Sequence, residues 1–138
     1  MRNPRSILSA CLTLSLAFSG CGNGTDGRDG EASKPEDQIV DVVTFDIDRI
    51  NEEGLVGPPG GLRSVTYEFC VPADSSSMAA VRAIDPTLEL HPGAPGRIGC
   101  TDGQVLCIGH TLQPGWKATL ARLAALDFVT RIDESFME

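Results

Sequence analysis

Residues 104–132 constrain the fold more than any other part of this 138-residue chain. Residues 105–108 form a nearly continuous apolar run, which is typical of a central strand. Residues 113–116 then make a turn that contains proline and glycine, and a helical pattern follows. The apolar stripe of this predicted helix consists of Trp116, Leu120, Leu123 and Ala124. A last strand is predicted over residues 129–136, so the stretch reads as the closing half of a split βαβ unit.

Residues 64–86 supply a matching first half. Residues 64–71 are rich in β-branched and aromatic side chains, and their alternation predicts a strand. The positions expected to face the core are Val65, Tyr67, Phe69 and Val71. A helix follows, with Asp74 or Ser75 as its expected N-cap and Pro86 ending it after Asp85.

The remaining segments complete the predicted sheet. Residues 87–100 predict an interrupted strand, and Thr101-Asp102-Gly103 predicts a hairpin turn. Residues 38–50 alternate apolar and polar side chains from Val43 on, which predicts an extra N-terminal strand, while residues 51–62 read as a loop. Residues 38–138 are therefore expected to form an α+β domain, a ferredoxin-like βαββαβ plait with strand order 4-1-3-2 and both helices on one face.

The first residues predict export and lipidation. Residues 1–20 contain a short basic region with Arg2 and Arg5, an apolar run and then small residues, as in a secretory signal peptide. The sequence Ala-Phe-Ser-Gly-Cys at positions 17–21 resembles the lipobox of bacterial lipoproteins, although Phe18 stands where that family prefers leucine. The resemblance implies a diacylglycerol anchor on Cys21. Ordinary secretory cleavage and a retained membrane span are the alternatives.

The composition indicates where the protein is located and which partners it can bind. Residues 21–37 are almost entirely glycine, serine and charged or amide side chains, which predicts a flexible tether. Loss of residues 1–20 leaves nine basic side chains against 19 acidic ones. This acidic balance argues against nucleic acid as a partner. We expect a cell-envelope protein attached to the membrane by its acyl chains, in the outer membrane if the host has one.

Three cysteines remain in the predicted domain: Cys70, Cys100 and Cys107. An oxidising envelope allows one disulfide among them. Cys70 and Cys107 are predicted on neighbouring strands and on the face away from the helices, so we expect this pair first and Cys70–Cys100 second, with three reduced thiols as the remaining alternative.

A chemical site is harder to find in the sequence. Cys100, Cys107 and His110, with His91, offer zinc-type ligands or a redox module, but their spacing matches no standard zinc pattern. Cys107 and His110 are three strand positions apart, so a nucleophile–base pair is expected to diverge. We therefore expect neither an enzyme nor a cofactor.

The closing half also resembles the propeptides of subtilisins and the related peptidase-inhibitor domains. The matching positions are Leu120, Leu123, Leu126, Phe128, Val129, Ile132, Asp133 and Glu134. The resemblance implies a C-terminal tail that enters a protease cleft, here Ser135, Phe136, Met137 and Glu138. The leading hypothesis is a non-enzymatic protein-binding module that uses the uncovered sheet face or an edge strand. A subtilase inhibitor and the metal or redox module are the alternatives.

Overall fold

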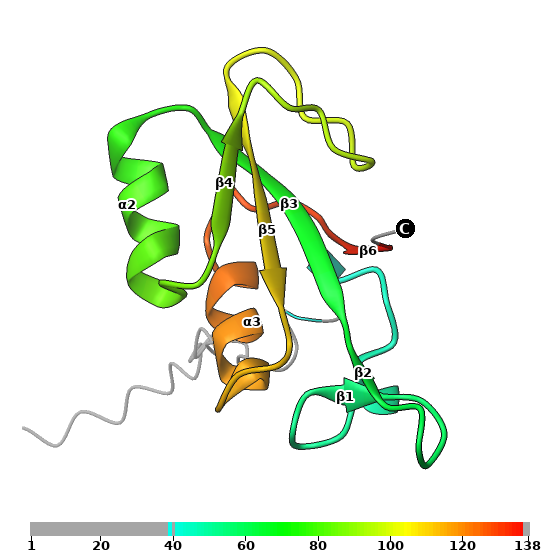
Figure 1. Cartoon of the computed structure of the whole chain (residues 1–138). Helices are drawn as coiled ribbons and strands as arrows, with labels where there is room; N and C mark the ends of the chain where they lie inside the picture. The colour runs from blue at the N-terminus through cyan, green and yellow to red at the C-terminus, as the bar shows by residue number, and fades with distance from the viewer. Residues whose placement is uncertain (1–38, 40, 137–138) are drawn as a thin grey trace, which may run out of the picture. The chain divides into compact units, whose positions relative to one another are not determined.

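The computed structural model describes Ile39 and residues 41–136 (Figure 1). The elements are the 3-10 helix η1 (Ile47–Arg49), the strands β1 (Leu55–Val56), β2 (Arg63–Ser64), β3 (Thr66–Pro72), β4 (Glu89–Pro92), β5 (Gln104–His110) and β6 (Ile132–Ser135), and the helices α2 (Ser75–Ile84) and α3 (Trp116–Ala124). None of the described helices has the length and apolar character needed to cross a bilayer.

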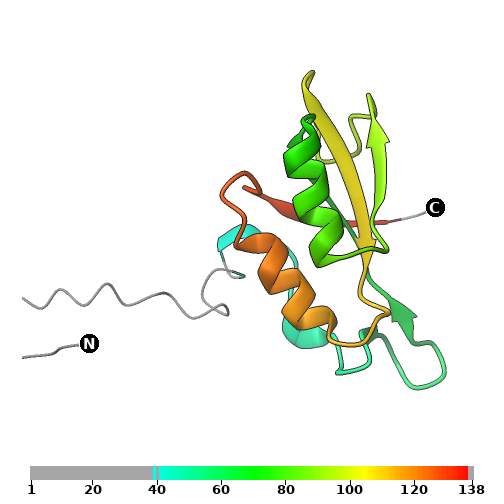
Figure 2. The ribbon, with the colours of Figure 1, turned by 90° about the vertical axis from the view of Figure 1, so that its left-hand side faces the viewer.

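The predicted α+β class is confirmed by a four-stranded antiparallel sheet and two helices. The sheet order is β4-β5-β3-β6, which is the order 4-1-3-2 when the strands are counted from β3. Figure 2 shows α2 and α3 on the same side of the sheet, as predicted. The two halves therefore interleave, since β5 from the second half lies between β3 and β4 from the first.

The core lies between this sheet and the helices. Tyr67 and Phe69 point from β3 into it as predicted, and they are 2% and 0% exposed. Val81 of α2 and the predicted stripe of α3 are buried against them. Burial of these side chains is the main stabilising contribution, at about 1.5–3 kcal/mol for each large apolar side chain.

Local signals fix the ends of α2. The Asp74 carboxylate accepts hydrogen bonds from the Ser77 amide at 2.8 Å and from the Ser76 hydroxyl at 2.6 Å, as a side-chain N-cap does. These bonds lower the pKa of Asp74 to about 2. Pro86 follows the C-cap residue Asp85. Both predicted ends of α2 are therefore confirmed.

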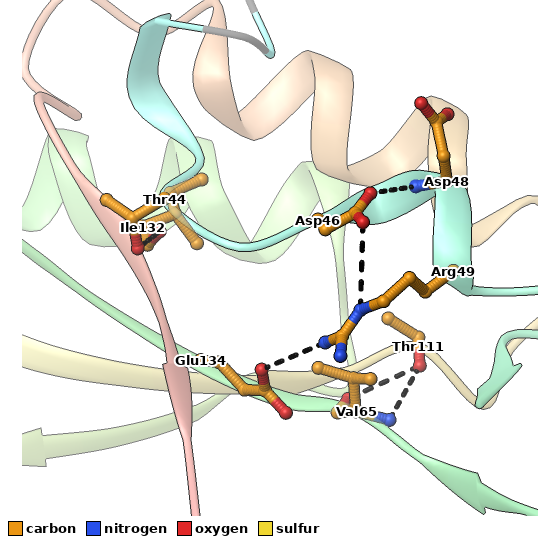
Figure 3. A network of polar contacts seen from close by, with 8 residues as sticks. All are labelled: Thr44, Asp46, Asp48, Arg49, Val65, Thr111, Ile132 and Glu134. Carbon is orange, nitrogen blue, oxygen red and sulfur yellow. Dashed lines mark hydrogen bonds and ion pairs between the residues drawn. The ribbon is translucent and has the colours of Figure 1, made fainter. Parts of the chain in front are cut away.

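The predicted N-terminal strand is wrong. Only Val43 forms a bridge, parallel to Ile132, and the chain then turns into η1. The reason is local, because the Asp46 carboxylate accepts the Asp48 amide at 3.0 Å and starts a turn where the alternation predicted an extended chain. Figure 3 shows how this segment is attached to β6, with Arg49 lying between Asp46 and Glu134 at 3.8 Å from each.

Two further segments differ from the prediction. Residues 51–62, expected as loop, contain β1, which pairs with β2 in a separate two-stranded sheet. Residues 96–99 form turns and do not resume the strand begun by β4. The predicted turn before β5 is confirmed, with Gly103 at a φ of 84° and the Gln104 amide bonded to the Thr101 carbonyl at 3.1 Å, but it does not form a tight hairpin, because β4 ends at Pro92.

Candidate functional site

The disulfide joins Cys70 and Cys100, so the second of the predicted pairings is confirmed and Cys70–Cys107 is wrong. The strand register explains the error. Cys107 lies opposite Phe69, while Cys70 lies opposite Leu106. Residues directly opposite each other share one face of a sheet, so Cys107 faces the helices and Cys70 faces away from them. The two thiols are on opposite faces.

Cys107 is a core residue. It forms no disulfide and is 0% exposed. Burial raises the pKa of its thiol to about 12, against a smaller opposing influence of the Arg82 charge. A thiol with this pKa stays protonated at neutral pH and is a poor nucleophile and metal ligand.

The metal or redox grouping of Cys100, Cys107 and His110 does not come together. The Cys100 sulfur is bonded to Cys70, Cys107 faces the helices, and His110 lies opposite Thr66 on the other face of the sheet. Within residues 41–136, no three acidic, cysteine or histidine side chains are placed to hold a metal ion. The predicted divergence of Cys107 and His110 is confirmed, and the three-residue module is wrong.

The sheet face away from the helices is partly covered. The loop between β4 and β5, drawn to the right of the sheet in Figure 1, crosses it and is fixed there by the disulfide. Beneath the loop, Glu68 is 3% exposed and its carboxylate accepts the Ile98 amide at 2.7 Å. Gly96 approaches Leu106 so closely that an added Cβ would lie 2.7 Å from a Leu106 methyl carbon. This face is therefore a poorer candidate surface than the sequence predicted.

The two edges of the sheet differ in how they are paired. At β6, the Thr44 amide donates to the Ile132 carbonyl at 3.0 Å, and the Thr44 hydroxyl donates to Asp133 at 2.8 Å (Figure 3 shows Thr44 beside Ile132). At the opposite edge, β4 pairs with β5 alone. Besides the ladder with β5, the described residues give β4 one further main-chain hydrogen bond, from the Ala94 amide to the His91 carbonyl at 3.3 Å, in the turn that follows the strand. The open edge of the sheet is that of β4.

An apolar hollow of about 440 Å³ lies beside this edge, between α2 and β4. We call it the β4 groove, and its lining residues are Ser75, Met78, Ala79, Arg82, Leu90 and Pro92. Leu90 pairs with Cys107 and Pro92 with Val105, which places both on the helix side of the sheet. Glu89 and His91 alternate with them and point the other way. The sequence predicted the separate elements, whereas the groove depends on how these elements meet in the folded chain.

Two other hollows are weaker candidates for a binding site, because polar groups beside them already form hydrogen bonds within the protein. One of about 190 Å³ lies at the start of α3, where the Trp116 indole donates to the Asn51 carbonyl at 3.1 Å. The other lies under residues 92–105, where Thr101 and Gln104 satisfy each other's polar groups. The first hollow is away from β4, and the second meets β4 only at its last residue, Pro92.

The predicted inhibitor tail is shorter than expected. Ser135 belongs to β6 and pairs with Thr66, so it is part of the sheet. Phe136 follows and is 52% exposed. Met137, Glu138 and the predicted signal, lipobox and tether of residues 1–37 lie outside the described residues.

No protein-family model, curated protein or solved structure matches this chain. The case for a function therefore rests on the open edge of β4 and the groove beside it.

Proposed function

We propose that this protein is a lipid-anchored module of the cell envelope that binds another protein without catalysing a reaction. The binding surface is the outer edge of β4 together with the β4 groove. The observation that supports this is the contrast between the sheet edges. The edge of β6 is engaged by Thr44, whereas β4 offers its outer main-chain groups beside an apolar hollow.

An open edge of this kind suits strand addition. An extended segment of a partner gains main-chain hydrogen bonds along the edge, and pockets for its alternate side chains provide selectivity. β4 is short, at four residues, and ends in Pro92, which has no amide proton to donate. A short edge limits uncontrolled pairing between sheets, while the groove adds the apolar contact that main-chain bonds alone lack.

The anchor is tested by the variant Cys21→Ala. The wild-type chain is expected to sediment with the membranes, because two or more acyl chains hold a protein stably in a bilayer. The variant is expected to move to the soluble envelope fraction, whereas Cys11→Ala, which changes a cysteine of the predicted signal, should leave the distribution unchanged. Unchanged membrane association of Cys21→Ala would contradict lipidation.

The binding surface is tested by placing a photo-cross-linking amino acid at Ala79, an exposed residue of the β4 groove. The matched control is Ala118, an alanine on α3 that is also exposed, and a third position is Phe136. We expect one discrete protein adduct from Ala79 in cells and none from Ala118. An adduct from Phe136 alone would contradict the proposal and favour the C-terminal tail of a protease inhibitor.

A further inference from the structure

Arg82 is the one charged residue among those that line the β4 groove. Its side chain is exposed, and it forms no ion pair with any residue in the described part of the chain. The acidic side chain nearest in sequence on β4, Glu89, points to the other face of the sheet. The groove therefore combines apolar walls with one cation that lacks a partner of opposite charge.

The topology fixes where this cation lies along the groove. β4 and β3 are both antiparallel to β5, so β4 runs parallel to β3, and α2 returns in the opposite direction. Ser75 consequently lies at the Pro92 end and Arg82 at the Glu89 end. From Ser75 to Arg82 the helix rises about 10 Å, which is the length of three to four extended residues.

A strand added to β4 would present every second side chain to the groove. The side chain beside Leu90 would lie over Met78 and Leu90, which are both half-buried apolar residues. The next side chain on the same face, two residues along toward the Glu89 end, would lie at Arg82. The groove therefore complements an apolar side chain at the first position and a negatively charged side chain at the second.

We propose that the partner supplies an extended segment with an apolar residue and a carboxylate two positions apart, the apolar side chain on Met78 and Leu90 and the carboxylate on Arg82. This rests on the proposed function and adds the chemistry of the bound segment. A guanidinium binds a carboxylate through paired N–H donors, so Arg82 sets the register of the added strand as well as its charge preference.

The test uses the full chain with Cys21→Ala, labelled with ¹⁵N and with its disulfide formed, and end-blocked heptapeptides of serine and threonine. The first pair of peptides carries Leu and Glu two positions apart, in either order. The second pair carries Leu and Lys at the same spacing and tests the charge. The third pair carries Leu and Glu at adjacent positions and tests the spacing. We expect the first pair to shift the amide resonances of α2 and β4 most strongly. The variant Arg82→Glu should weaken its binding by about three- to tenfold and transfer the preference to the Lys peptides.

Arg122→Glu is the matched control, because Arg122 is exposed in the last turn of α3 as Arg82 is in the last turn of α2. It should leave every peptide affinity unchanged. Equal shifts with the Glu and Lys peptides, or an unchanged preference in a folded Arg82→Glu variant, would overturn the inference. The proposed function would survive that outcome if the cross-link from Ala79 forms, and it fails separately if no cross-link forms there.

Discussion

Replacing both Cys70 and Cys100 by serine is expected to lower the free energy of unfolding by about 3–4 kcal/mol, the loss that chain-entropy arguments assign to a closed loop of this size. The two cysteines are 30 residues apart, so their bond removes many conformations from the unfolded chain. The bond also fixes the loop whose Ile98 amide donates to the buried Glu68 carboxylate. Urea unfolding of the oxidised wild type and of the double variant measures the effect.

Cys107→Ala is the control for that experiment. It removes the one unbonded cysteine of the described residues and leaves the disulfide in place. Loss of one small buried group should cost about 1 kcal/mol. A reducing agent should destabilise the wild type and the Cys107→Ala variant by the same amount and leave the double serine variant unaffected. Equal unfolding free energies of the oxidised wild type and the double serine variant would contradict the stabilising role of the bond.

The substitution Asp85→Ala is expected to have the second large effect, lowering the free energy of unfolding by about 3–5 kcal/mol. Asp85 is 0% exposed and its carboxylate accepts hydrogen bonds from the Tyr67 hydroxyl at 3.3 Å and the Gln113 amide group at 3.0 Å. It also accepts the amide and hydroxyl of Thr87 at 2.9 and 2.6 Å. Removing the carboxylate leaves the buried Tyr67 hydroxyl and the part-buried donors of Thr87 and Gln113 without this acceptor. Thermal and urea unfolding measure the loss.

Asp127→Ala is the matched control, since Asp127 also follows a helix but is exposed. We expect its unfolding free energy to stay within about 0.5 kcal/mol of the wild-type value. A similarly small effect of Asp85→Ala would show that the buried network contributes little.

Asp85 also predicts how stability depends on pH. Burial raises its pKa, but the hydrogen bonds from Thr87, Gln113 and Tyr67 outweigh burial and hold the pKa below the usual value in the folded chain. A lowered folded-state pKa contributes stability above the unfolded carboxyl pKa of about 4, and this stability is lost as the pH falls through the folded-state value. The unfolding free energy of the wild type should therefore fall more steeply below about pH 4 than that of Asp85→Asn.

The sequence predicted those parts of the fold that local patterns determine. The alternation from Val65 to Val71, the Asp74 cap and the Trp116–Ala124 stripe each specify one element and its buried face, and all three are confirmed. The order of the strands followed from the right-handed βαβ connection. Residues 38–50 had the same alternation as a strand, but the Asp46 side chain turns the chain after a single bridge at Val43.

The sidedness of β5 could not be read from its residues. The prediction that Cys107 faces away from the helices places Leu106 and Ile108 on the helix side, because successive strand positions alternate between the two faces. Leu106 is instead buried on the other face, under the loop that the disulfide holds, so both faces of β5 are apolar. A continuous apolar run does not show which of its residues face the helices. The prediction chose the wrong face for Cys107 and so placed it beside Cys70.

The β4 groove was missed because it belongs to no single element. Met78 and Arg82 lie in the predicted helix and Leu90 in the interrupted strand predicted over residues 87–100, and their meeting depends on β4 becoming the edge of the sheet. An arginine one position after the buried Val81, on a helix that precedes a short strand, was the available signal. This arginine can be assigned to a groove only when the strand order, with β4 at the edge, is known.

Amide hydrogen exchange along β4 bears most directly on the proposed strand addition. In the free protein, the amides of residues 89–91 that point outward should exchange quickly, while the amides of β3, paired on both sides, exchange slowly. In the purified cross-linked complex, at least one outward amide of β4 should become protected. Unchanged exchange along β4, with new protection at β6 or Phe136, would contradict strand addition at this edge.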